Sequence, residues 1–341
     1  MNQPAPHAPP PHAQLMQFIT GHWVTAALHS AARLDLADHL HAGPQNCADL
    51  ARATDCHEDS LYRLLRALSS LGIFEETAPR TFKNTDVGEC LRKDHPRSLR
   101  GMILFQGAAP HWHGWGSLLH SVRTGQSAFE HVHQQGFFDY CQAHPEFGNV
   151  FNDAMTGMAT STAEAVLQGY DFSGISKLID VGGGHGYLIS RILQKYPQLQ
   201  GGLFDLPEVV KAAPALLKHA GVADRCAITG GSFFEAVPPA DAYISSHIIH
   251  DWDDEHSIRI LKTMRSSLAP NGRVLLVELV ISDERDEDFG VWLDLEMLHA
   301  THGGRERTTA EYAELFAAAG LRLNRVVTTP SPTCVLEALP A

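Results

Sequence analysis

The chain has 341 residues, of which 44% are hydrophobic and 19% are charged, so it is long enough to bury the core of one large or two medium domains. Its formal net charge of −13, from 26 Lys and Arg against 39 Asp and Glu, argues against nucleic acid as a partner. No apolar run approaches the roughly 18 residues of a transmembrane helix, and the six cysteines are scattered without a CxxC pair. We therefore expect a cytoplasmic protein with reduced thiols that does not bind membranes.

The first hundred residues predict a short lead-in and then a helical domain. Residues 1–13 are rich in Pro and His and have no signal-peptide character, so we expect a disordered segment. From 14 to 100, apolar residues recur at three-to-four spacing, as in helices. Two later helices, the second with Asp59 or Ser60 as its N-cap, precede the hairpin-like stretch IFEETAPRTFKNT. This order of elements is typical of a winged helix.

A winged helix can bind DNA or join two subunits. The DNA-reading helix would be SLYRLLRALSSL, but its Arg63 and Arg66 lie among leucines, and acidic residues nearby oppose a phosphate-binding face. The high apolar content favours a dimerisation platform, so we expect a homodimer through residues 14–100. A DNA-binding regulator is the alternative, and its binding would depend steeply on salt.

Residues 101–170 are again helical and rich in aromatic side chains, and we expect them to form a connector. The sequences HWH and HVH do not indicate a metal site, because positions i and i+2 diverge on a helix and no carboxylate or Cys completes either set. We therefore expect no bound metal. The aromatic and Met side chains form either plain core or the wall of a pocket for a flat ligand.

Short β-rich runs alternate with amphipathic helices from residue 171 to 341, which predicts an α/β domain with a doubly wound, mostly parallel sheet. The last two strands, LRLNRVVT and TCVLEAL, have no helix between them. The final strand should therefore run antiparallel, at or near an edge of the sheet.

The first strand of this domain ends in IDVGGGHG, where a buried strand turns into a helix. Gly182, Gly184 and Gly186 allow positive φ angles and a close approach of the backbone to a ligand. A dinucleotide fingerprint would need glycine where this chain has Tyr187. A GxGxG loop preceded by Asp180 instead favours S-adenosylmethionine, and an NAD oxidoreductase is the competing interpretation.

Two further strand ends add to this nucleoside site. Asp205, in GGLFDLP, can accept hydrogen bonds from both ribose hydroxyls, although NAD enzymes use an acid in the same way. Ser232 and Phe233, in GGSFF, are placed to hold adenine by a hydrogen bond and by stacking. The glycine loop, the ribose acid and the adenine pair together form a strong signal, whereas GxGxG alone is weak.

Six motifs, DVGGGHG, FDLPEVV, GGSFFEAVPPADAY, HDWDDE, LVE and GGRERT, follow one another in this order. Over nearly the whole chain they resemble small-molecule O-methyltransferases of the caffeic-acid/isoflavone type and their bacterial secondary-metabolite relatives. The resemblance implies a class I methyltransferase Rossmann-like sheet, S-adenosylmethionine as methyl donor, S-adenosylhomocysteine as product, and a homodimer joined by the N-terminal winged-helix domain. Together with the residues above, it gives these expected cofactor-binding positions: Asp180, Gly182, Gly184, Gly186, Asp205, Leu206, Ser232, Phe233, Ser246 and Trp252.

By this resemblance, His250 of HDW is the catalytic base, and Glu278 of LVELV and Glu306 of GGRERT are the acids that flank and orient it. The chain departs from the family pattern at two positions. Ser232 stands where many plant members have Asp, which weakens the expected adenine contact. Ser246 stands where they commonly have Lys, which removes a positive charge near the methionine end of the donor. Neither departure touches the transfer chemistry.

The proposed chemistry explains these residue types. A phenol, with a pKa of about 10, is mostly un-ionised at neutral pH, so a neutral imidazole has to take its proton. A carboxylate on the other ring nitrogen fixes the tautomer and stabilises the imidazolium. Glu278, at the end of the next strand, is expected to be this partner, and Glu306 to cap the pocket or contact the substrate. The methyl group moves in line and charge disperses, so no metal is required.

The segment HIIHDWDDE, residues 247–255, then divides into parts. Asp253 or Asp254 is expected to cap a helix, and Trp252 either packs or forms a wall of the cofactor site. His247 stays open between the substrate pocket and the core. The later acidic run SDERDED is expected to be a solvated loop.

A helix over VWLDLEMLHATHGG is expected to cover the substrate pocket. Its side chains predict a planar aromatic guest with a few polar handles, such as a phenazine or a polyketide phenol, but they specify neither the ring system nor the position methylated. A non-catalytic or repurposed family member is the remaining alternative, although such a protein would lack the base. The expected substrate-binding residues are Phe138, Asn152, Met155, His247, Trp292, Met297 and Leu298.

Overall fold

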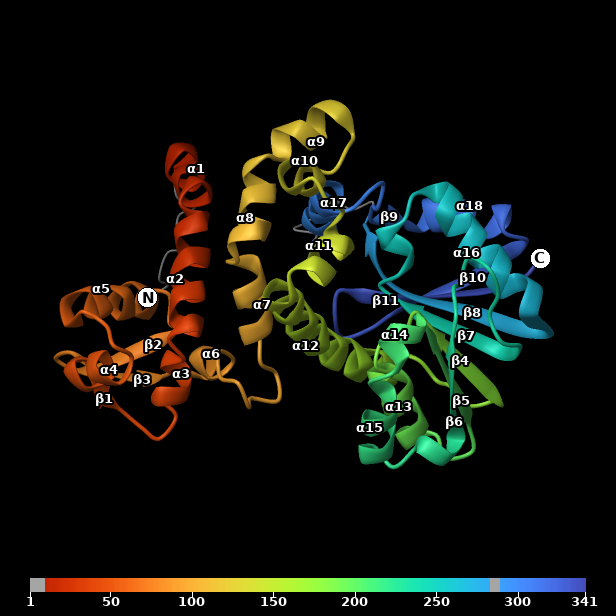
Figure 1. Ribbon diagram of the computed structural model, residues 1–341, viewed down its shortest axis with the longest axis horizontal. Coiled ribbons are helices and arrows are strands. Elements are labelled where there is room, and N and C mark those ends of the chain that lie inside the picture. Colours follow the sequence, from red (N-terminus) through yellow and green to blue (C-terminus); the bar gives the residue numbers. More distant parts are fainter. Residues whose placement is uncertain (1–9, 283–288) are drawn as a thin grey trace, which may run out of the picture. The chain divides into compact units, whose positions relative to one another are not determined.

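A computed structural model describes residues 10–282 and 289–341 (Figure 1). The chain divides into two compact units, one of residues 1–112 with 144–157 and one of residues 113–143 with 158–341. Residues 101–170, predicted to form a connector, are therefore divided between the two units and do not form a separate unit. Most of the acidic run predicted as a solvated loop, residues 283–288, lies outside the described residues.

The first unit is mainly helical. Its first helix begins at Pro11, inside the segment predicted to be disordered, because proline is well suited to the first turn of a helix; residues 1–9 of that segment lie outside the described part of the chain. The elements in order are α1 (Pro11–Ile19), α2 (Gly21–Arg33), α3 (Leu36–His39), β1 (Gln45–Asn46), α4 (Cys47–Ala53), α5 (Glu58–Ser69), β2 (Phe74–Ala78), β3 (Thr81–Asn84), α6 (Asp86–Glu89) and α7 (Arg100–Gln106).

The helices α4 and α5 and the antiparallel hairpin β2–β3 form the predicted winged-helix arrangement, with β1 added on β3. The leucine face of α5 is buried against Phe74 and Phe82 of the hairpin, so it belongs to the core. The predicted N-cap is wrong: His57 is the N-cap of α5, and Asp59 lies in the first turn, where it accepts a hydrogen bond from Arg80 at 2.9 Å.

The second unit contains a sheet in the order β10-β11-β8-β7-β4-β5-β6. Its strands are parallel except β11, which is antiparallel to both neighbours and lies next to the edge, as predicted. The short strand β9 pairs with the end of β8 in parallel. The strands are β4 (Lys177–Val181), β5 (Gln200–Asp205), β6 (Cys226–Gly230), β7 (Ala240–Ser246), β8 (Leu268–Ile281), β9 (Arg307–Thr308), β10 (Leu321–Thr328) and β11 (Thr333–Pro340).

Helices cover both faces of this sheet (Figure 1). One buried cluster joins α12, α13 and α15 to the sheet, and a second joins α16 and α18 to its other face. The helices of this part of the chain are α8 (Ala109–Gly116), α9 (Leu118–Thr124), α10 (Ala128–His133), α11 (Phe137–Ala143), α12 (Pro145–Gly169), α13 (Tyr187–Lys195), α14 (Pro207–Val210), α15 (Ala213–His219), η1 (Ala223–Arg225), η2 (Ile249–Asp251), α16 (Asp254–Ser267), α17 (Phe289–Ala300) and α18 (Thr309–Ala318).

The carboxyl ends of parallel strands meet at one edge of a sheet, which is where open α/β sheets bind their ligands. Here that edge gathers the glycine loop after β4, Asp205 at the end of β5, and the segment after β7 that contains His250. No helix within residues 10–282 and 289–341 is long and apolar enough to cross a membrane.

Candidate active site

The glycine loop after β4 has the backbone that only glycine adopts easily. The φ angles of Gly182, Gly184 and Gly186 are 73°, 59° and 84°. Between them, Gly183 has no room for a side chain, because a Cβ atom there would lie 2.5 Å from Cγ of Asp180. The loop therefore lies close against the sheet and presents backbone, without side chains at its glycines, to a ligand.

Two aspartates lie beside this loop, and one of them is hydrogen-bonded to it. Asp205 accepts a hydrogen bond from the backbone N–H of Gly184 at 2.8 Å and another from that of Leu206 at 2.6 Å. Asp180 is buried beneath the loop, and neither of its carboxylate oxygens has a hydrogen-bond partner among the described residues. Burial, followed by the charge of Asp205, raises the pKa of Asp180 to about 7. A buried carboxyl without a partner is suited to a polar or cationic ligand.

An apolar corner lies beyond β6. Trp252 stands edge-to-face against Phe233 and Phe234, with ring centroids 6.1 and 4.8 Å away. The Ser232 hydroxyl accepts the backbone N–H of Phe234 at 3.3 Å, so it supports this turn. Leu206 is exposed at the end of the neighbouring strand. These side chains offer apolar contact to a flat ring.

The imidazole of His250 is buried beside a carboxylate. Its Nδ1 lies 2.7 Å from Oε1 of Glu306, which is also buried. Glu278 was the predicted partner at this nitrogen, and that part of the prediction is wrong, because Glu306 takes the position. The parallel pairing of β9 with β8 brings Glu306 to His250 after the chain has passed through α17.

Glu278 instead binds backbone N–H groups next to His250. Its Oε1 accepts the backbone N–H groups of Ile248 and Ile249 at 3.2 and 2.9 Å, while its Oε2 lies 3.9 Å from Nδ1 of His250. Burial raises the pKa of Glu278 to about 8. The charge of His250 acts to lower this pKa, and the charge of Glu306 acts to raise it further. Glu278 thus fixes the backbone before His250, and its carboxyl ionises less readily than that of an ordinary glutamic acid.

The electrostatics of His250 reflect three carboxylates. Burial by itself would lower the pKa of His250, but Asp251, Glu278 and Glu306 outweigh it and raise the pKa to about 10. Oδ1 of Asp251 lies 3.6 Å from Nε2, the nitrogen that Glu306 leaves free. An imidazole whose pKa is close to that of a phenol can exchange a proton with it at little cost in free energy.

His247 lies beside His250, with its ring centroid 5.5 Å away. Its φ of 54° is unusual for a residue with a side chain. Nδ1 lies 3.0 Å from the hydroxyl of Ser246, and Nε2 has no partner among the described residues. Burial, and then the charge of His250, lower the pKa of His247 to about 3, so this ring is neutral.

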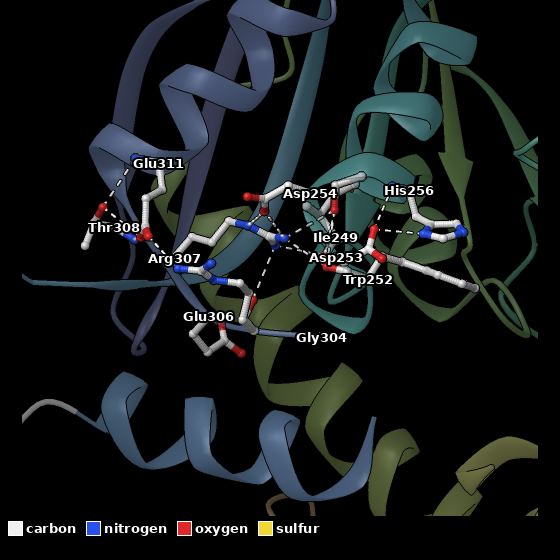
Figure 2. A network of polar contacts seen from close by, with 12 residues as sticks. Ile249, Trp252, Asp253, Asp254, His256, Gly304, Glu306, Arg307, Thr308 and Glu311 are labelled. Carbon is white, nitrogen blue, oxygen red and sulfur yellow. Dashed lines mark hydrogen bonds and ion pairs between the residues drawn. The ribbon is translucent and has the colours of Figure 1, made fainter. Parts of the chain in front are cut away.

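The acids after Trp252 are divided between two roles. Asp253 is the N-cap of α16 and accepts the backbone N–H of His256 at 2.8 Å, which confirms the helix-capping prediction (Figure 2). Asp254 instead pairs with the buried guanidinium of Arg307, which no motif in the sequence marks. Asp294 on α17, also not predicted, accepts the backbone N–H of Glu306 at its Oδ1 at 2.9 Å.

The predicted substrate residues are spread over both units. Phe138 on α11 and Trp292 on α17 are exposed, and Met297 and Leu298 follow Trp292 on that helix. Asn152 and Met155 lie on the part of α12 that belongs to the first unit, so their place in a pocket stays a prediction. His250, Glu278 and Glu306 each offer an atom within 4.8 Å of the others, as a cation site requires, but hydrogen bonds already engage Nδ1 of His250 and Oε1 of Glu278.

Comparison with protein families gives the class of this protein. Residues 115–322 match the O-methyltransferase domain, and residues 16–94 match the O-methyltransferase dimerisation domain. The chain therefore belongs to the O-methyltransferase family, as the resemblance of its motifs implied, and it is an enzyme of that class.

Named relatives are similar to this chain over most of its length. The chain is 42% identical to the phenazine O-methyltransferase PhzM of Lysobacter antibioticus, over 96% of this chain and 95% of the relative. It is 37% identical to the mitomycin biosynthesis 6-O-methyltransferase of Streptomyces lavendulae, over 90% and 88% of the two chains. A further relative of 35% identity, over 90% of this chain and 83% of the relative, is named aclacinomycin 10-hydroxylase RdmB, from Streptomyces purpurascens.

Solved structures resemble this chain over nearly its whole length. The crystal structure of LaPhzM matches with a TM-score of 0.91 and 42% identity, covering 98% of this chain and all of that one. The O-methyltransferase NcsB1 from neocarzinostatin biosynthesis, solved with S-adenosylmethionine and 2-hydroxy-5-methyl naphthoic acid, matches with a TM-score of 0.77 and 31% identity over 93% and 96% of the chains.

Proposed function

We propose that this enzyme transfers a methyl group from S-adenosylmethionine to a phenolic hydroxyl of a planar aromatic natural product, of phenazine or polyketide-like type. The observation that carries this proposal is the buried His250–Glu306 hydrogen bond, which lies at the same sheet edge as the glycine loop. The names of the phenazine and mitomycin relatives, and the naphthoic acid bound to NcsB1, support the aromatic class of acceptor.

The residues present fit this methyl donor. Because Gly183 has no room for a side chain and Gly184 has a positive φ, the loop presents backbone that a nucleoside can approach closely. Asp205 is placed for the ribose hydroxyls, and the apolar corner of Leu206, Phe233 and Trp252 for adenine. Asp180, buried and without a partner, and Ser246 at the end of β7 are the polar groups left for the methionine part. When bound, S-adenosylmethionine supplies a methyl group made electrophilic by its sulfonium.

The chain's own residues handle the proton. Nδ1–H of His250 donates to Glu306, so Nε2 faces the acceptor hydroxyl as a proton acceptor. As the phenol oxygen forms its bond to carbon, its proton passes to Nε2, and the carboxylate of Glu306 stabilises the resulting imidazolium. Glu278 keeps the backbone N–H groups of Ile248 and Ile249 in place throughout.

The alternatives receive less support. The relative named as a hydroxylase indicates that members of this family carry different activities, but this chain retains the base and its carboxylate. A DNA-binding regulator is not favoured, because residues 16–94 match an O-methyltransferase dimerisation domain and residues 115–322 match the O-methyltransferase domain.

The N-terminal domain supports a homodimer. Helices α1 and α2 expose a set of large apolar side chains that a second copy of the domain would cover: Leu15, Met16, Phe18, Ile19 and Trp23. The match of residues 16–94 to a dimerisation domain supports the same assembly. A cytoplasmic location, with neither nucleic acid nor membrane as partner, stays a prediction.

A mass-spectrometric screen tests this function. The purified chain is incubated with S-adenosylmethionine and a panel of hydroxyphenazines, hydroxynaphthoates and simple catechols. We expect a mass gain of one CH₂ unit on a fused-ring phenol, with formation of S-adenosylhomocysteine. Methylation of none of the fused-ring acceptors, by a chain that binds S-adenosylhomocysteine, would contradict the proposed acceptor class.

A further inference from the structure

Arg307 is the largest fully buried side chain in the described part of the molecule, with 1% of its surface exposed. Most of its guanidinium hydrogen bonds go to one stretch of chain, the segment from η2 to the start of α16, and one goes to the carbonyl of Arg305 at 3.3 Å (Figure 2). The acceptors in that segment are Oδ1 of Asp254 at 3.0 and 2.8 Å, the carbonyl of Trp252 at 2.8 Å, the carbonyl of Ile249 at 3.1 Å and the hydroxyl of Ser257 at 3.4 Å.

Burying a guanidinium is unfavourable unless its charge is paired and its donors are satisfied. Among the described residues, the carboxylate partner of Arg307 is Asp254, which has 57% of its side chain exposed, so the ion pair lies at the rim of the buried site. An apolar side chain of similar volume would fill the same space at less cost. The directional hydrogen bonds to the backbone carbonyls of Ile249 and Trp252 are what an apolar side chain would lack.

These bonds hold the backbone on both sides of His250. Glu278 accepts the N–H groups of Ile248 and Ile249 just before it, and Arg307 donates to the carbonyls of Ile249 and Trp252. Because the carboxyl group of Glu278 takes the N–H groups and the guanidinium of Arg307 takes the carbonyl groups, the segment is fixed at two ends. His250 lies between those fixed points.

Arg307 also follows Glu306 directly in the chain. The residues just before β9, which include Glu306, are thus tied to the segment that carries His250 by the side chain of the next residue. The turn before it is equally close: a Cβ atom on Gly304 would lie 2.6 Å from the carbonyl oxygen of His250, and the backbone N–H of Arg305 donates to that oxygen at 2.8 Å.

We propose that Arg307 is a positioning residue that holds Glu306 in hydrogen-bonding register with His250. Its kinetic consequence rests on the function proposed above, but its structural consequence does not. Without the guanidinium, the segment of His250 and the residues around Glu306 can shift against each other. A displacement of about 1 Å at a reacting group can cost on the order of 10²-fold in rate.

The first experiment measures the His250–Glu306 bond without any methyl donor. Proton NMR follows the downfield imidazole N–H resonance of His250 in Arg307→Lys, in Arg307→Gln and in a control, Arg265→Gln, whose side chain lies further along α16 and bonds Gly320. We expect the resonance to broaden or vanish in both Arg307 variants and to persist in the control. A sharp, unshifted resonance in folded Arg307→Gln would overturn the proposal, whatever the chain's activity.

The second experiment is a double-mutant cycle with Glu306→Gln. If Arg307 acts through Glu306, Arg307→Lys should lower kcat by about 10- to 100-fold alone and add little in the Glu306→Gln background. Multiplicative losses would mean that Arg307 acts independently and would refute the proposal. Asp254→Asn, which weakens the same guanidinium anchor from the surface, should show the same non-additivity and keeps the test available if the Arg307 variants do not fold.

Discussion

His250 and Glu306 lie 56 residues apart in the chain, yet Nδ1 of the one is 2.7 Å from Oε1 of the other, and both side chains are buried. This bond determines which nitrogen of His250 can act as a base. With Nδ1 engaged by the carboxylate, Nε2 is the nitrogen that remains for an acceptor hydroxyl.

The pH dependence of turnover should reflect the carboxylates around His250. Its pKa is raised to about 10, and only the neutral imidazole can take a proton, so kcat/KM should rise with pH from neutral into the alkaline range. Glu306→Gln removes one of the charges that raise this pKa, so its ascending limb should move to lower pH. A wild-type limb centred at the ordinary histidine value of about 6.5 would contradict this expectation.

Glu306 and Glu278 should respond differently to the same substitution. Glu306→Gln removes the charge that stabilises the imidazolium, and kcat should fall by about 10²-fold or more. Glu278→Gln keeps an oxygen for the backbone N–H groups of Ile248 and Ile249 and leaves the Glu306 carboxylate on Nδ1 of His250, so kcat should fall less than about tenfold. Steady-state kinetics on both variants checks the contrast, and equal losses would refute the division of roles.

Asp205 should control binding of the cofactor. Asp205→Ala removes the acceptor that ties down Gly184 and is placed for the ribose, and loss of hydrogen bonds to a charged group, worth about 1.5–3 kcal/mol each, should weaken S-adenosylhomocysteine binding at least tenfold. Calorimetric titration measures this. Glu208→Gln, three residues on and paired only at the surface with Lys211, serves as the control and should bind normally. Normal binding by Asp205→Ala would remove Asp205 from the cofactor site.

The apolar face of α1 and α2 should be the dimer interface. Phe18 and Trp23 are 76% and 64% exposed, so replacing both with Glu would place charge in a buried contact of the assembly. Light scattering after size exclusion should then report the mass of one chain. The comparably exposed Leu71, outside these helices, offers a control as Leu71→Glu, which should stay dimeric. A dimer that survives the double substitution would place the interface elsewhere.

The parts of the fold that the sequence predicted well are those with local signals. The glycine loop, the acid at the end of β5 and the cap at Asp253 follow from neighbouring residues, and the antiparallel β11 follows from a missing helix. The partner of His250 had no such signal. Glu306 reaches it because the two-residue strand β9 pairs with β8, a tertiary contact that no periodicity marks.

Arg307 was missed for a related reason. In the sequence it is one of several arginines near acidic residues, and arginine is normally exposed. Only the folded chain shows that its guanidinium is enclosed by the carbonyls on either side of His250. Similarly, Asp59 has the residue type of an N-cap, but α5 begins a residue earlier, at Glu58, and Asp59 pairs with Arg80.

His250→Ala shows whether His250 is the base of a methyl transfer, through two measurements on one preparation. Single-turnover transfer to a phenolic acceptor should fall by about 10²- to 10⁴-fold, the usual contribution of general base catalysis. Calorimetric affinity for S-adenosylhomocysteine should stay at the wild-type value, since no cofactor contact is assigned to this side chain. Wild-type transfer by the variant would contradict the account.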